Sequence, residues 1–284
     1  MTTNLSGHDG EGREFATPDE LWAVEADADG GHNTWYRKAV SYWDQQEASY
    51  NGVLGGFGYT SDIDVRDSRA LLLKSMRAQL EAADKGSRNL TALDCGAGVG
   101  RVTEQLLRHH FHTVDLLEPS RHLLDTAAKN LAARTVPQPR GKAGSFYCSG
   151  LQEHAFEPGR YDAIWIQWCL LYLTDVDFIS LFHRAAAGLK PDGLIFVKEN
   201  ICKDGFVVDK EDSSLTRSNA YMLDLFERAG VQVLYNVKQR NWPKELFEVR
   251  MYVVRPRGSA QGGQQQPQQQ PQVVAEPPGA EAMG

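Results

Sequence analysis

The sequence predicts a doubly wound α/β domain with a mostly parallel sheet. The main observation is that apolar runs of strand length alternate with helical patterns along the middle of the chain. A second observation is a glycine-rich turn between the first of these strands and the helix that follows it. A third is that both ends of the chain have compositions that cannot build a core, which leaves one central domain.

The elements follow one another in the order of repeated strand-helix-strand units. The expected strands span residues 90–95, 113–118, 146–149, 161–168 and 194–200. The expected helices between them span residues 101–109, 121–131 and 174–187. Such a sheet is buried on both faces and binds ligands at the carboxyl ends of its strands. After it, a helix is expected at 219–229, and strands at 232–237 and 246–254 predict a closing antiparallel hairpin.

The two ends differ from the middle in composition. Residues 1–33 hold eight acidic side chains and a single basic one, Arg13, and they predict an acidic disordered tail. Residues 258–284 are rich in Gln and Pro and predict a second disordered tail. Residues 34–257 are close to neutral and contain no run of Lys and Arg, so nucleic acid is not expected as a direct partner.

Cysteine usage and hydropathy indicate a cytoplasmic or nuclear protein. The four cysteines are scattered without a Cys-x-x-Cys pair, which suggests neither a disulfide framework nor a zinc site. No signal peptide opens the chain, and the longest apolar run, residues 163–173, is too short to span a bilayer. We expect His109, His110 and His112 at the surface without carboxylate partners, and therefore expect no metal site.

The glycine-rich turn is the most informative segment. The chain passes from a strand through Gly96, Gly98 and Gly100 into a helix that begins at Arg101. Glycines at such a turn let a ligand approach the backbone closely. The third glycine comes one residue too early for a dinucleotide fingerprint, which disfavours NAD. S-adenosylmethionine has no phosphate but has a carboxylate, which Arg101 and the helix N-terminus can hold.

An acid ends the second strand. Glu118 lies 22 positions after Gly96, where nucleoside-binding folds place an acid that accepts the ribose hydroxyls. Alone, this residue would be interpreted as a solvated or helix-capping acid. Together with the glycine-rich turn, it favours a nucleoside cofactor.

The segment Leu93–Gly100 resembles the first motif of the class I S-adenosylmethionine methyltransferases. Further segments resemble one branch of them, the α-N-terminal Xaa-Pro-Lys/Arg protein methyltransferases, over about residues 35–255. These segments are Gly52–Gly58, Gly150–Gln152, Ile164–Trp168, Val197–Asn200 and Asp212–Ser214. The resemblance implies a Rossmann-like class I methyltransferase domain with an N-terminal helical extension.

The resemblance also implies which residues bind S-adenosylmethionine: Gly96, Gly98, Arg101, Glu118, Pro119, Ser120, Leu151, Gln152 and Gln167. Leu151 suits the face of a purine, and the amide of Gln152 offers both a donor and an acceptor. Gln167 lies at the carboxyl end of a strand, where sheet ligands bind. The alternative for Gln167 is a buried amide satisfied by the protein itself.

The implied acceptor is the free α-amine of a protein that begins Xaa-Pro-Lys or Xaa-Pro-Arg after loss of the initiator methionine. The residues implied to bind it are Trp43, Leu54, Gly55, Trp168, Asn200, Asp209, Asp212, Ser214 and Leu246. Aromatic faces suit a small first residue or a cation, and carboxylates suit the amine and the third-residue cation. The alternatives are core packing for Trp168 and a solvated loop for Asp209 and Asp212.

Three residues are candidates for the chemistry. We expect Asp212 to accept the amine proton, directly or through water, and Asn200 to bind the first carbonyl of the substrate. At the position where the family has a second catalytic group, a histidine, this chain has Tyr172. A neutral tyrosine can orient an amine but is a poor base near pH 7.

Two other functions stay open on sequence grounds. One is a methyltransferase that acts on a small molecule or on a lysine side chain. The other is a protein that binds the cofactor without turnover and acts as a partner of an active homologue.

Overall fold

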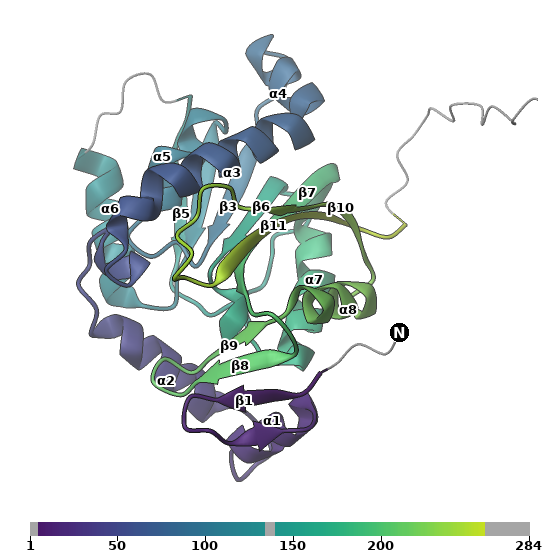
Figure 1. Cartoon of the computed structure of the whole chain (residues 1–284). Coiled ribbons are helices and arrows are strands. Elements are labelled where there is room, and N and C mark those ends of the chain that lie inside the picture. Colours follow the sequence, from purple (N-terminus) through teal and green to yellow (C-terminus); the bar gives the residue numbers. More distant parts are fainter. Residues whose placement is uncertain (1–4, 134–139, 259–284) are drawn as a thin grey trace, which may run out of the picture.

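The computed structural model describes residues 5–133 and 140–258. Its centre is a seven-stranded sheet in the order β10-β11-β7-β6-β3-β4-β5 (Figure 1). The strands are β3 (Thr91–Cys95), β4 (Thr113–Leu117), β5 (Lys142–Tyr147), β6 (Tyr161–Gln167), β7 (Leu189–Ile201), β10 (Val231–Lys238) and β11 (Glu248–Pro256). Strands β5, β4, β3, β6 and β7 are parallel, and β11 is antiparallel to β7 and β10. The predicted α/β fold and its closing hairpin are confirmed.

Helices cover both faces of this sheet. Side chains of β3 alternate between two cores: Ala92 packs in the core shared with α3 to α5, and Leu93 in the core shared with α7 and α8. All seven residues of β6 are buried, as expected for a central parallel strand. The helices are α2 (Asn33–Asp44), α3 (Ser61–Ser75), α4 (Arg77–Asp84), α5 (Arg101–Gln105), α6 (Arg121–Ala133), α7 (Asp175–Gly188) and α8 (Asn219–Arg228).

The predicted helix at 101–109 is shorter than expected. It ends at Gln105, and a separate 3₁₀ helix, η3 (Leu107–His109), follows. The non-helical backbone of Leu106 (φ −129°, ψ −65°) separates the two, and both Leu106 and Leu107 reach the core. His109, His110 and His112 are half-buried, and thus more enclosed than the surface positions that we expected.

The prediction that residues 1–33 are a disordered tail is wrong for the part that the structure describes. Residues 5–33 include β1 (Gly7–Asp9), β2 (Glu14–Phe15) and α1 (Pro18–Glu25). Phe15, Leu21 and Trp22 are buried there, and the Trp22 ring packs edge-on against Trp35 of α2 with centroids 5.3 Å apart. The predicted tail at 258–284 lies, beyond Gly258, outside the described residues.

A second, four-stranded sheet joins this N-terminal segment to the domain. Its order is β2-β1-β8-β9, where β8 (Phe206–Asp209) and β9 (Ser214–Arg217) form a hairpin after β7. Strand β1 pairs in parallel with β8, and Figure 1 shows β1 and α1 lying beside β8 and β9 at one end of the molecule. The N-terminal segment therefore extends the hairpin.

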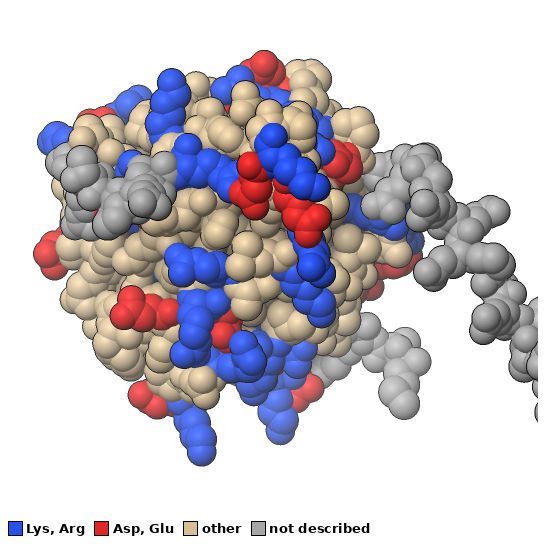
Figure 2. All heavy atoms as spheres, turned by 90° about the horizontal axis from the view of Figure 1, so that it is seen from above, with Lys and Arg blue, Asp and Glu red and all other residues tan. Residues whose placement is uncertain are grey.

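One face of the molecule carries more basic than acidic side chains. Figure 2 shows that Lys and Arg side chains predominate over Asp and Glu on the face seen from above, at the α4 end and away from β1. Among the described residues, no helix is long and apolar enough to cross a bilayer.

Candidate functional site

The glycine-rich turn after β3 has the backbone conformation that only glycine adopts readily. Gly96 and Gly98 have φ angles of +66° and +53°. A Cβ on Gly96 would lie 2.7 Å from the Cβ of Cys169, which leaves no room for a side chain. The turn thus keeps its backbone open toward the pocket beside it.

Glu118 stands opposite this turn at the end of β4. Its two carboxylate oxygens accept the backbone N–H groups of Gly98 and Ser120, each at 2.9 Å. Burial raises the pKa of Glu118 to about 7. The predicted cofactor residue Ser120 is fully buried and does not line the pocket. Its backbone N–H helps to orient Glu118, and its hydroxyl donates to Asp44 at 2.6 Å.

A pocket at the carboxyl ends of β3, β4 and β6 collects the other predicted cofactor residues. These are Gly96, Gly98, Arg101, Glu118, Pro119, Leu151, Gln152 and Gln167. Helix α2 closes the pocket with Tyr36, Ala39 and Val40, which sequence reasoning missed although the helix is amphipathic. The pocket combines an apolar wall with a buried carboxylate and an arginine, which suits the adenine, ribose and carboxylate of S-adenosylmethionine.

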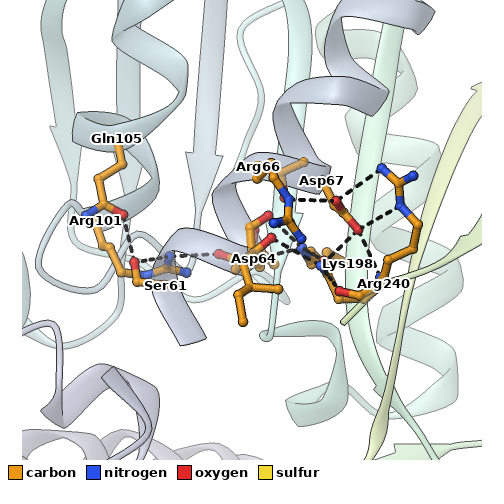
Figure 3. Close-up of polar contacts among 12 residues, drawn as sticks. Ser61, Asp64, Arg66, Asp67, Arg101, Gln105, Lys198 and Arg240 are labelled. Carbon is orange, nitrogen blue, oxygen red and sulfur yellow. Dashed lines mark hydrogen bonds and ion pairs between the residues drawn. The ribbon is translucent and has the colours of Figure 1, made fainter. Parts of the chain in front are cut away.

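Arg101 is fixed by a buried ion network that Figure 3 shows between α3, α5 and β7. Its Nη1 donates to Asp64 at 2.7 Å and to Ser61 Oγ at 3.1 Å. The Lys198 ammonium lies 2.5 Å from the other oxygen of Asp64, which also accepts Gln167 Nε2 at 2.9 Å. Burial alone would raise the pKa of Asp64, but Lys198 and Arg101 outweigh it and lower that pKa. Both Arg101 contacts use Nη1, so Nη2 and Nε are the donors that can face a cofactor carboxylate.

Gln167 has a structural role as well. Its amide donates to Asp64 and its oxygen accepts the Trp165 indole N–H at 2.9 Å. The amide is therefore satisfied by side chains within the protein, while the residue also lines the pocket.

A second groove runs beside the first pocket and collects all nine residues predicted for the acceptor. They are Trp43, Leu54, Gly55, Trp168, Asn200, Asp209, Asp212, Ser214 and Leu246. The groove has further walls that sequence reasoning missed: Gly10, Glu11, Phe57, Trp242 and Phe247. The N-terminal pair was missed because that segment was interpreted as disordered.

The loop that carries Leu54 and Gly55 is hydrogen-bonded to helix α5 at both of its ends. At one end the Tyr50 hydroxyl hydrogen-bonds Glu104, and at the other the Ser61 hydroxyl donates to Gln105 at 2.7 Å. The loop contains the 3₁₀ helices η1 (Gly52–Leu54) and η2 (Gly58–Thr60). Helix α5, which follows the glycine-rich turn, therefore positions one wall of the acceptor groove.

The pocket and the groove meet at Trp43, Val53, Trp168 and Tyr172, which line both. Trp168 has a φ of +53°, an uncommon backbone conformation for a residue other than glycine. The backbone N–H of Trp168 donates to the Lys198 carbonyl at 2.9 Å. This bond holds the strained turn against β7. A methyl donor in the pocket and an acceptor in the groove would face each other at this junction.

A carboxylate and two aromatic side chains form a chain of hydrogen bonds at the junction. The Trp43 indole donates to the Tyr172 hydroxyl at 2.8 Å, and that hydroxyl donates to Asp212 Oδ2 at 3.2 Å. The other oxygen, Asp212 Oδ1, is buried, and hydrogen bonds from Ser214 to the carboxylate oppose the effect of burial on its pKa. Burial raises the pKa of Asp212 above its ordinary value, and it raises that of Tyr172 further above 10. Tyr172 is therefore neutral near pH 7.

Comparison with known proteins assigns the chain to a family. The sequence profile described as "AdoMet dependent proline di-methyltransferase" matches residues 31–255. The chain belongs to this family. An Arabidopsis thaliana relative, "Alpha N-terminal protein methyltransferase 1", is 45% identical over 253 residues, which cover 88% of this chain and 91% of the relative. This protein is an S-adenosylmethionine-dependent N-terminal protein methyltransferase.

Other relatives of this methyltransferase agree. The Xenopus laevis "N-terminal Xaa-Pro-Lys N-methyltransferase 1-B" is 38% identical over 220 residues, covering 78% of this chain and 95% of the relative. The solved structure of a SAM-dependent methyltransferase of Leishmania major is 40% identical, with a TM-score of 0.77, over 90% of this chain and 98% of that one.

The turn that carries Tyr172 in this methyltransferase depends on another buried acid. The Glu199 side chain accepts the backbone N–H groups of Cys169 and Leu170 at 2.8 and 3.1 Å. Burial raises the pKa of Glu199 to about 8. Glu199 was not predicted, because an acid inside an apolar strand gives no signal of which turn it will support.

Proposed function

We propose that this enzyme methylates the free α-amine of proteins that begin Xaa-Pro-Lys or Xaa-Pro-Arg after removal of the initiator methionine. The observation that supports the proposal is the junction, where Asp212 lines the acceptor groove and accepts a hydrogen bond from Tyr172, which lines both the groove and the cofactor pocket. The name of the Xenopus relative, which specifies an Xaa-Pro-Lys N-terminus, supports it.

The groove has the chemistry that such an N-terminus requires. Leu54, Gly55 and Leu246 offer an apolar wall and a close-approach turn for the proline ring, with Gly55 at a φ of +58°. Asp209 and Asp212 offer carboxylates for the third-residue cation and the amine, and Asn200 an amide for the first carbonyl. The groove thus matches an apolar second residue followed by a basic third one.

In the proposed role, Asp212 removes the proton that the amine must lose before its lone pair can attack. An α-amine has a pKa of about 8 and loses this proton far more readily than a lysine side chain does at about 10.4. The raised pKa of Asp212 makes the carboxylate a better proton acceptor. Tyr172 holds the carboxylate in place through the hydrogen bond to Oδ2. S-adenosylmethionine supplies a sulfonium methyl, and as the N–C bond forms the C–S bond breaks to leave S-adenosylhomocysteine.

The cofactor residues are assigned by the same reasoning. We assign Glu118 to the ribose hydroxyls, Arg101 to the carboxylate, Leu151 and Gln152 to adenine, and the open turn at Gly96 to close backbone approach. A cytoplasmic or nuclear location agrees with the free thiols of the four cysteines, three of them buried.

A panel of peptides tests the proposed acceptor. Ser-Pro-Lys should be methylated efficiently, whereas Ser-Ala-Lys leaves the apolar wall unfilled and Ser-Pro-Gln leaves a partly desolvated carboxylate without its cation. We expect kcat/KM for both altered peptides to fall by about tenfold or more. Equal kcat/KM values for the three peptides would refute the assigned specificity.

A further inference from the structure

The N-terminal segment contributes to the acceptor groove although it lies outside the family profile. The profile match begins at residue 31, yet Gly10 and Glu11 line the groove. They are held there because β1 pairs with β8, from Gly7 opposite Phe206 to Asp9 opposite Val208. The loop after β1 therefore lies beside Asp209, the last residue of β8.

A lysine side chain lies among the acidic residues of this groove. Of the described residues that line it, Glu11, Asp209, Glu211 and Asp212 are acidic, and Lys210 alone is basic. The Lys210 ammonium lies 2.6 Å from Asp9 Oδ2 and 3.0 Å from Glu11 Oε2. Both partners belong to the N-terminal segment. The two ion pairs raise the pKa of Lys210, and Lys210 lowers the pKa of Asp9. The lysine is thus charged and turned toward β1.

We propose that Asp9 and Glu11 determine specificity by holding the Lys210 cation away from the acceptor carboxylates, which leaves these carboxylates for a cationic substrate. The inference rests on the proposed function and adds residues outside the profile to the specificity of the same groove. Lysine has a flexible four-carbon stem and a strongly hydrated charge. Released from β1, its ammonium would pair with neighbouring Asp209 or Glu211 and compete with the lysine of the substrate.

The geometry assigns the two acids different parts of this task. Asp9 is 1% exposed, and its Oδ1 accepts the backbone N–H groups of Glu11 and Arg13 at 3.0 and 2.8 Å. It therefore shapes the turn with one oxygen and holds Lys210 with the other. Glu11 is largely exposed at the rim, and it closes on the ammonium from the solvent side.

A mutational cycle on the full chain tests the proposal. The variant Asp9→Asn/Glu11→Gln removes both charges, while the amide oxygen of the new asparagine can still accept the two turn N–H groups. We expect KM for the Ser-Pro-Lys peptide to rise about three- to tenfold, with the Kd for S-adenosylmethionine unchanged, because the effect is confined to the groove. Adding Lys210→Met to this variant removes the competing cation and should bring KM back to within about twofold of the parent value.

Controls separate charge from folding. Glu14→Gln removes an exposed acid from β2, outside the groove, and should leave KM as it is. Added salt should shrink the KM difference between the double variant and the parent, since screening weakens exposed charges. The proposal is overturned if the double variant keeps the parent KM, or if KM rises and Lys210→Met does not restore it. A parent enzyme that does not methylate the peptide would instead refute the proposed function.

Discussion

At the scale of single residues, the proposed chemistry depends on the Asp212 carboxylate and on the hydrogen bonds that hold it. Tyr172 donates to Oδ2, Oδ1 is buried, and hydrogen bonds from Ser214 also stabilise the carboxylate. Asp212→Asn keeps the shape but removes the base and its charge. We expect kcat to fall by roughly 10²-fold or more while the Kd for S-adenosylmethionine barely changes, as measured by steady-state kinetics and titration calorimetry.

Tyr172→Phe is the matched variant for this prediction. It removes one hydrogen bond to Asp212 and leaves the carboxylate in place, so kcat should fall by only about tenfold. A loss as large as that in Asp212→Asn would contradict the positioning role and would mean that the hydroxyl carries the proton transfer.

Glu118 makes cofactor binding dependent on pH. Its pKa is raised from 4.5 to about 7, and the carboxylate form is the one that can accept two ribose hydroxyls. Binding should therefore strengthen as pH rises through 7, by roughly tenfold between pH 6 and pH 8. Glu118→Gln should remove this part of the dependence, and comparing the two proteins cancels titration of the cofactor itself. The test is the Kd for S-adenosylmethionine, measured by calorimetry at both pH values. If Kd depended equally on pH in both proteins, the assignment of Glu118 to the ribose would be rejected.

How far the site could be predicted differs from residue to residue. The strand, the glycine turn and Glu118 form a local pattern of fixed spacing, so sequence alone places them together. The hydrogen bonds of Ser120 and Gln167 could not be predicted, because their partners Asp44 and Asp64 come from helices far away in the sequence. The same holds for Lys198, whose partner on α3 is 134 positions away.

At the scale of elements, the N-terminal segment shows why composition misled. Most of its acidic side chains are exposed, Asp9 being the buried exception, whereas Phe15, Leu21 and Trp22 are buried and α1 has a local start signal. The Thr17 hydroxyl accepts Glu20 N–H at 3.3 Å, and the Glu20 carboxylate accepts Ala16 N–H at 2.7 Å, with Pro18 in the first turn. This variant of a capping box was present in the sequence, and average acidity outweighed it in our interpretation.

Removing this segment should destabilise the enzyme. Deletion of residues 1–30 exposes surface that Phe15, Leu21 and Trp22 cover, and each buried apolar side chain contributes about 1.5–3 kcal/mol. We expect the melting temperature to fall by roughly 5–15 °C in a thermal scan. Deletion of residues 259–284 is the control and should leave the transition unchanged. An unaltered melting temperature after the first deletion would mean that the segment does not pack on the domain in solution.

At the scale of the whole molecule, the succession of strands in the seven-stranded sheet was predictable, because most of its parallel strands are apolar runs between helical patterns, whereas the β8–β9 hairpin was not predicted. Two of these strands begin earlier than expected. Strand β5 begins four residues earlier, since all its residues are exposed or half-buried and give no apolar run, and β7 begins five residues earlier, at Leu189. The groove and the face at the α4 end differ in charge. Acids gather in the groove, and Lys and Arg predominate on the face at the α4 end (Figure 2). This polarity favours the approach of a basic N-terminus to the groove.

The most direct test of the proposed function compares a free Ser-Pro-Lys peptide with its N-acetylated form, each incubated with the enzyme and S-adenosylmethionine and analysed by mass spectrometry. Acetylation removes the nucleophile and leaves the proline and the lysine in place. We predict methyl groups on the α-nitrogen of the free peptide and none on the acetylated one. Methylation of the acetylated peptide at a similar rate would place the methyl group on the side chain and contradict the α-amine assignment.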